Sequence, residues 1–394
     1  MGRKTLIFIS IVTFSVMFSI SMVGPLLGVL INIEGIYLGR NPNFSLGLIF
    51  AFEGLTLSLL QLPFSNLSNR FGRRIFIFLG SIIVGISVAS IGFSAVFARV
   101  IGDPVIGEWS LSACFLALFR TLQGVGGAST WPILMALIPL IYSEESLGTA
   151  MGFFGASFGL GMALGPVIGP GLAAVTNVYI PFLFASALAM ASAVLSLKLP
   201  DYRGSDIGRR VFKMPDDKNI LLLSIVGFSL MFSMGTLVVI YPKFLLDVLG
   251  FSVKELAVLL SLASLTFAFL QPLFGKLSDK MGRKKLIPLG LTITFIAMLG
   301  IAFSTSFSLI SIMMFLFGVS GALIFPSATG LLGERSTSST VGTNSGFFNM
   351  MVSLGVTIAP IIVGLTSDVL GYTMGFLVPP MLLVIGLVSS LLVR

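Results

Sequence analysis

Two charged residues, a carboxylate that could take up and release a proton and an arginine that could pair with it, lie inside long apolar runs. Glu53 falls in the stretch SLGLIFAFEGLTLSLL, and Arg120 falls in the stretch ACFLALFRTLQGVGGA. Each lies about ten residues from the start of its run, which is roughly 15 Å at the rise of an α-helix. This depth is near the middle of a hydrocarbon core about 30 Å thick. The two side chains therefore share one depth, which permits a pair.

Composition narrows the chemistry that is open to this chain. The sequence has no histidine and a single cysteine, Cys114, so an internal disulfide, a Cys/His metal site and proton transfer by imidazole are excluded. Of the 15 acidic residues, Glu53 is the only one deep in an apolar run. It has two interpretations: a carboxylate that couples transport to protons, or a static partner that neutralises Arg120.

The sequence lacks the motifs that other classes of function require. No phosphate-binding G-x-x-x-x-G-K-[ST] sequence and no Ser/His/Asp set is present, so we expect neither an ATP-driven pump nor an enzyme, and neither a cofactor nor a metal. The net charge of +8 comes from basic residues in short segments between apolar runs, which is typical of membrane orientation and not of nucleic-acid binding.

The elements that carry these residues are predicted to be membrane helices. Hydrophobic residues make up 56% of the chain and charged residues 10%, whereas soluble proteins average about 25% charged. Twelve apolar runs have the length of about 20 residues that a membrane helix needs. With twelve helices, Arg40, Arg99, Lys243 and Lys254 lie on one side, and all the other Lys and Arg residues outside the helices lie on the opposite side. The positive-inside rule then predicts a multi-pass protein of the plasma membrane with both termini in the cytoplasm.

The sequence repeats itself. QLPFSNLSNRFGRRIFIFLG, from residue 61, aligns without gaps with QPLFGKLSDKMGRKKLIPLG, from residue 271, at an offset of 210. GTAMGFF, from residue 148, recurs as GTNSGFF, from residue 342, at an offset of 194. We therefore predict two homologous six-helix halves, residues 1–198 and 219–394, joined by a polar cytoplasmic linker over residues 199–218.

The repeated basic loop resembles a motif of the major facilitator superfamily: Gly, any, Leu, any, Asp, Arg/Lys, any, Gly, Arg, Arg/Lys. The second copy matches it fully, whereas the first has Ser65 in place of the first glycine and Asn69 in place of the aspartate. Glycine at the turn allows a positive φ. The resemblance implies that these loops gate the cytoplasmic side, with a weaker latch where Asn69 lacks the charge. The expected gating residues are Asn69, Arg70, Gly72, Arg73, Arg74, Asp279, Lys280, Gly282, Arg283 and Lys284.

Two further motifs are similar to those of the twelve-helix drug/proton antiporters of that superfamily. Arg120 and Gln123 match its intramembrane arginine pattern on the fourth helix. The fifth helix carries the antiporter-type glycines and prolines, namely Gly155, Gly159, Gly161, Gly165, Pro166, Gly169 and Pro170. Glycines four apart make a flat groove for a neighbouring helix, and prolines permit bending. Related antiporters often carry an acidic residue on the first helix, and this chain has none there.

This resemblance implies an all-α integral membrane fold of two pseudo-symmetric six-helix bundles. We expect a monomeric secondary transporter that works by alternating access and exports small hydrophobic or cationic compounds in exchange for protons, with Glu53, Arg120 and Gln123 in the cavity. The alternatives are a uniporter or proton symporter of a polar metabolite, and a non-transporting sensor or lipid-handling protein on the same fold.

Overall fold

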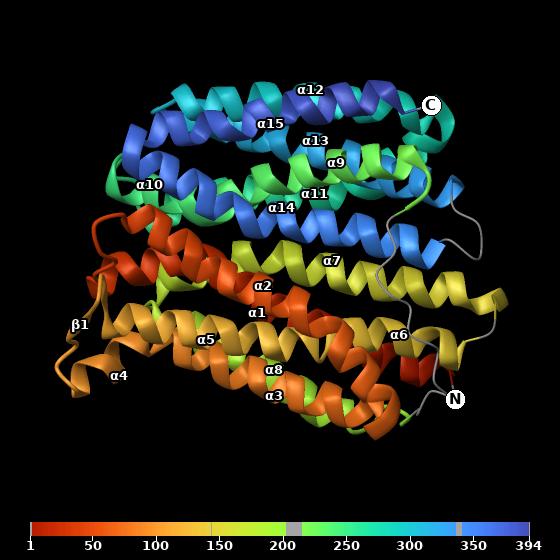
Figure 1. Ribbon diagram of the computed structural model, residues 1–394, viewed down its shortest axis with the longest axis horizontal. Helices are drawn as coiled ribbons and strands as arrows, with labels where there is room; N and C mark the ends of the chain where they lie inside the picture. Colours follow the sequence, from red (N-terminus) through yellow and green to blue (C-terminus); the bar gives the residue numbers. More distant parts are fainter. Residues whose placement is uncertain (1, 143, 202–214, 336–340, 394) are drawn as a thin grey trace. The chain divides into compact units, whose positions relative to one another are not determined.

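The protein is almost entirely helical in a computed structural model that describes residues 2–142, 144–201, 215–335 and 341–393 (Figure 1). Within these ranges, 12 segments are long and apolar enough to cross a membrane. Two of them are interrupted: Leu111–Ile138 takes in two helices, and Lys218–Asp247 contains a π-helical turn. The predicted number of membrane helices is confirmed.

The first compact unit comprises Met1–Arg40 and Ile49–Gly208. Its α1 begins at the end of the unit opposite to α4 and the small hairpin β1–β2 (Figure 1). In the hairpin, Val105 pairs with Ser110 and Ile106 with Trp109. The elements are α1 (Gly2–Glu34), α2 (Pro42–Phe71), α3 (Arg73–Gly92), α4 (Ser94–Val100), β1 (Val105–Ile106), β2 (Trp109–Ser110), α5 (Leu111–Ala128), α6 (Trp131–Ile141), α7 (Glu144–Val175) and α8 (Tyr179–Ser196).

The second compact unit comprises Arg209–Arg394 and also Asn41–Leu48, which is the residue before α2 and the first seven residues of that helix. Within this unit the Asp368 carboxylate accepts hydrogen bonds from the backbone N–H groups of Asn43 (3.2 Å) and Phe44 (2.8 Å), as well as from the Asn43 side chain (2.9 Å). The elements are α9 (Lys218–Gly235), the π-helical turn Thr236–Ile240, α10 (Tyr241–Asp247), α11 (Val253–Met281), α12 (Arg283–Phe303), α13 (Phe307–Glu334), α14 (Val341–Leu370) and α15 (Tyr372–Leu392).

Each unit packs its helices in the same pairs. In the first unit α1 lies along α7 and α8, and α3 lies along α5 and α8. In the second unit α9 lies along α14 and α15, and α12 lies along α13 and α15. The sequence offsets of 210 and 194 align each of these helices of the first unit with its counterpart in the second unit. The sequence repeat is therefore also a repeat in helix packing.

Close approach of α7 to α1 depends on part of the glycine motif. A Cβ atom added at Gly165 would contact Ser21 Oγ and lie 2.8 Å from the backbone nitrogen of Met22, and one at Gly161 would lie 2.8 Å from the carbonyl oxygen of Phe14. Gly169 also faces α1, whereas among the described residues no atom outside the neighbouring backbone of α7 lies within 4 Å of the corresponding position at Gly155 or Gly159. The expected groove is therefore built by the glycines that face α1.

The two repeated loops are turns of a single residue. Gly72 separates α2 from α3 and has a φ of 104°, and Gly282 separates α11 from α12 and has a φ of 93°. Residues with a side chain rarely adopt such angles. The expectation of positive φ at both glycines is confirmed.

Replacement of Gly165 by alanine is expected to lower the free energy of unfolding by roughly 1–3 kcal/mol, because the new methyl group must displace backbone atoms of α1. Gly159→Ala is the matched control on the same helix. Its new methyl group meets no atom of another helix within 4 Å in the described part of the chain and should not destabilise the protein. Thermal unfolding of both purified variants in detergent checks this, and equal unfolding temperatures for the two would contradict the packing described here.

Candidate functional site

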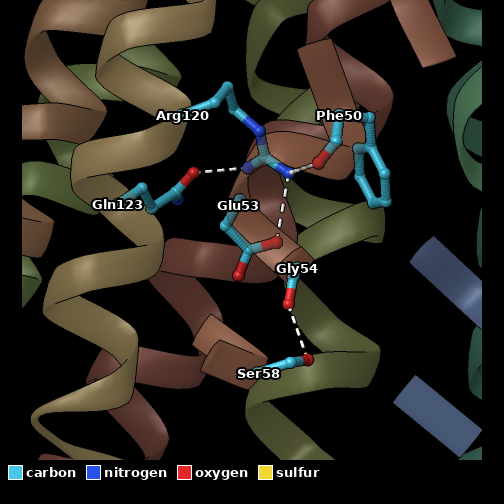
Figure 2. A network of polar contacts seen from close by, with 6 residues as sticks. All are labelled: Phe50, Glu53, Gly54, Ser58, Arg120 and Gln123. Carbon is cyan, nitrogen blue, oxygen red and sulfur yellow. Dashed lines mark hydrogen bonds and ion pairs between the residues drawn. The ribbon is translucent and has the colours of Figure 1, made fainter. Parts of the chain in front are cut away.

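Glu53 and Arg120 form an ion pair within the first unit. The Arg120 Nη2 atom lies 3.2 Å from the Glu53 Oε2 atom (Figure 2). The Arg120 side chain is 1% exposed and that of Glu53 is 12% exposed. The sequence placed the two residues at equal depth, and the structure brings them together.

The guanidinium of Arg120 is held by several groups besides Glu53. Its Nη2 also donates to the carbonyl oxygen of Phe50 at 3.2 Å, and its Nη1 donates to the Oε1 atom of Gln123. The Phe50 ring lies 4.7 Å from the guanidinium carbon, within the range of a cation–π contact. Gln123 reaches Arg120 because residues three apart share one face of a helix. Phe50 was not expected from the sequence, although its position three residues before Glu53 on α2 is a usable signal.

A glycine allows α5 to run against α2 beside the ion pair. A Cβ atom added at Gly124 would contact the carbonyl oxygen of Glu53 and lie 2.9 Å from the Cβ atom of Thr56. Any larger residue at this position would push the two helices apart. The glycine of the R-T-L-Q-G sequence thus sets the distance between Arg120 and Glu53.

The second unit repeats this helix crossing without the charges. A Cβ atom added at Gly318 of α13 would lie 2.5 Å from the carbonyl oxygen of Ala263 and 2.7 Å from the Cβ atom of Thr266 on α11. By the offsets of 210 and 194, Ala263 corresponds to Glu53 and Met314 to Arg120. Met314 is fully buried, and Ala263 is also buried. The fold can therefore build this crossing from apolar side chains alone.

Two donors of the charged network have no hydrogen-bond partner among the described residues. They are the Nε atom of Arg120 and the Nε2 atom of Gln123. Arg120 and Gln123 are respectively 1% and 0% exposed, so both donors are enclosed by protein in this conformation. A buried donor without a partner destabilises a protein by about 1–3 kcal/mol. A ligand that brings an acceptor to these two donors would remove this cost.

Part of the predicted gating set lies at the two single-glycine turns. Arg73, directly after the first turn, donates through Nη1 to the carbonyl oxygen of Ala136, whereas Arg283, at the matching position, pairs with Glu334 at 3.2 Å. Arg70 lies over the Phe71 ring at 5.4 Å. Lys280 lies next to the second turn, before Gly282, and Lys284 follows it. The side chains of Asn69 and Asp279 lie outside the described part of the structure.

One carboxylate near the first turn was missed by sequence reasoning. Asp201 follows α8, yet its Oδ1 atom accepts a hydrogen bond from the backbone nitrogen of Arg74 at 3.3 Å. A Cβ atom at Gly72 would lie 2.7 Å from the same oxygen. No local pattern predicts this contact, because Asp201 is more than a hundred residues away in sequence.

The two prolines of the antiporter-type motif lie away from the ion pair. Pro166 and Pro170 lie inside α7, between and beside the glycines that contact α1. They do not join the Glu53–Arg120 network. Among the described residues no group of three or more His, Cys, Asp or Glu side chains is placed to hold a metal ion.

A double replacement tests whether the ion pair is needed for folding. Arg120→Met alone leaves a carboxylate buried without its partner, which is expected to cost roughly 3–5 kcal/mol. Glu53→Ala combined with Arg120→Met copies the residues of the second unit and should recover at least about 1 kcal/mol of that loss. Thermal unfolding in detergent is measured for the unmodified protein, the two single variants and the double variant, which together form a double-mutant cycle. Strictly additive losses would show that the two side chains do not interact.

Comparison with known proteins places the chain in a family. The family model of the Major Facilitator Superfamily matches residues 9–212 and 223–394. An uncharacterized MFS-type transporter, MJ1560, from Methanocaldococcus jannaschii is 24% identical over 387 residues, which cover 94% of each chain. The quinolone resistance protein NorA of Staphylococcus aureus is 27% identical over 153 residues, 39% of each chain.

The fold has relatives among solved structures. A bacterial homologue of the human lysosomal transporter Spinster superposes with a TM-score of 0.76 at 16% identity, over 98% of this chain and 96% of that one. At this identity the likeness concerns the fold alone. Because the family model matches most of the chain, the chain is a multi-pass membrane transporter and not an enzyme. The chain belongs to the Major Facilitator Superfamily.

Proposed function

We propose that this protein is a proton-coupled antiporter that exports small hydrophobic or cationic compounds by alternating access, with Glu53 as the coupling carboxylate. In this proposal the two six-helix halves, 1–198 and 219–394, rock about a midplane cavity. The protein acts as a monomer in the plasma membrane, with both termini and the 199–218 linker in the cytoplasm.

The observation that carries the proposal is the difference between the two equivalent crossings. Glu53 and Arg120 occupy positions where the second unit has Ala263 and Met314, and that crossing packs without them. A charged pair inside the membrane is costly and is not required here by the architecture. This favours a role in transport over static neutralisation of Arg120.

The position of Glu53 suits a group that exchanges protons. Every other acidic residue in a described helix lies within two residues of a helix end, whereas Glu53 is eleven residues inside α2. A proton on Glu53 removes the charge that holds Arg120 and leaves the site with one net positive charge. A cationic compound favours the ionised carboxylate. Compound and proton would therefore compete for the same state of the site, which is the requirement for antiport.

The name of one relative is consistent with export. NorA, with which the chain shares 153 aligned residues, is described as a quinolone resistance protein. The gating loops with Gly72 and Gly282, and the glycines of α7 that face α1, are proposed to permit the change between inward-open and outward-open states. The first loop would latch without a charge at Asn69.

Replacement of Glu53 by glutamine is expected to abolish uphill transport, because glutamine keeps hydrogen-bonding capacity but cannot take up and release a proton. The measurement uses proteoliposomes with an imposed pH gradient and a panel of hydrophobic compounds, cationic and neutral. The variant should lose gradient-driven accumulation and keep downhill exchange.

Ser58→Ala is the matched control on α2, because the Ser58 hydroxyl bonds to the carbonyl oxygen of Gly54 in its own helix at 2.7 Å and not to the ion pair (Figure 2). It should accumulate compounds as the unmodified protein does. Undiminished gradient-driven flux in Glu53→Gln would overturn the proposal and leave Glu53 as a static partner of Arg120.

A further inference from the structure

We infer that the site selects compounds that carry a carbonyl or carboxylate oxygen, which the free donors of Gln123 and Arg120 bind. The inference rests on the proposed function, since it names the class of compound that the same site takes. It adds a chemical requirement to compounds that are otherwise hydrophobic or cationic.

The fully buried atoms of the network that lack hydrogen-bond partners are all donors. In the part of the chain that the structure describes, the buried side-chain atoms of this network without partners are Arg120 Nε and Gln123 Nε2, and both are donors. Arginine has no acceptor at all, and the one acceptor of the Gln123 side chain is already used by Arg120 Nη1. A ligand that satisfies these groups must bring oxygen acceptors. A purely cationic ligand would leave them unpaired.

The arrangement of the network keeps the Gln123 donor in place. Because its Oε1 accepts from Arg120, the amide cannot turn to present oxygen to a ligand without breaking a charge-assisted hydrogen bond. Figure 2 shows Gln123, Phe50 and Glu53 converging on the same guanidinium from two helices. The donors are thus oriented before any compound binds, which reduces the entropy lost on binding.

Glu53 is more exposed than its partner. Its side chain is 12% exposed, whereas that of Arg120 is 1% exposed, so in this conformation a compound can reach the carboxylate but not the guanidinium. Among the described residues, Arg120 is the charged group in contact with Glu53. A compound with an amine or other cation near its oxygen acceptor could contact Glu53 and the donors together. The selection of the compound by the donors would then be linked to proton exchange at Glu53.

The test measures binding to the full-length purified protein in detergent, without any pH gradient. The probes are 4-benzoylbenzyl-trimethylammonium and 4-benzylbenzyl-trimethylammonium, which have the same rings and charge and differ by a ketone in place of a methylene group. The ketone is expected to bind about tenfold more tightly, because a site with unpaired donors discriminates against a ligand that lacks the acceptor.

Two variants assign the preference to Gln123. Gln123→Leu removes the donor and should reduce the preference to about twofold or less. Gln123→Glu keeps an acceptor for Arg120 and therefore the local structure, but it replaces the free donor by an oxygen and should abolish the preference. Ser58→Ala should retain it in full.

Equal affinity of the two probes for the unmodified protein, or binding of neither, would overturn the inference. So would a full preference in both Gln123 variants. The result is separable from the proposed antiport, because binding is measured without a gradient. Loss of coupling in Glu53→Gln is a different readout, and either result can fail while the other holds.

Discussion

A guanidinium in the middle of an apolar span must find its partners inside the protein, and the centre of the first unit is arranged around this constraint. Arg120 takes its acceptors from two helices: Glu53 and the carbonyl of Phe50 on α2, and Gln123 on α5 itself. Gly124 brings the helices close enough for these bonds to form. An unpaired arginine at this depth would be unfavourable by about 2.5–3.5 kcal/mol even on insertion scales.

The duplicated architecture separates what the fold needs from what the chemistry needs. Both units use a glycine at the same crossing, Gly124 in one and Gly318 in the other, and both place a threonine opposite it. Only the first of the two crossings adds charges. The frame is thus set by backbone approach and apolar packing, and the ion pair is an addition to a crossing that the second unit completes with Ala263 and Met314.

Much of this organisation could be predicted from the sequence, because it depends on local patterns. Apolar runs of membrane length predicted the spans, a gapless repeat predicted the duplicated packing, and glycines in the basic loops predicted positive φ. Equal depth predicted that Glu53 and Arg120 could meet, and the motif resemblance placed Gln123 in the same cavity. The roles of the gating residues and of Gln123 in transport stay predictions.

Other features depend on tertiary structure and leave little trace in the sequence. The spacing of the α7 glycines does not tell which of them face α1, so Gly155 and Gly159 were grouped with Gly161 and Gly165. The contact of Asp201 with Arg74 joins distant segments, and the π-helical turn at Thr236–Ile240 has no composition that distinguishes it from an α-helix. Long-range contacts decide these features.

The central claim is that one proton and one compound compete for the state of Glu53, and proton release on binding tests this most directly. Purified protein in weakly buffered solution with a pH indicator is mixed with a transported compound. At a pH low enough for Glu53 to carry a proton in the compound-free protein, we predict that the unmodified protein releases about one proton per bound compound and that Glu53→Gln binds without release. Binding without proton release by the unmodified protein, or equal release by the variant, would contradict the account.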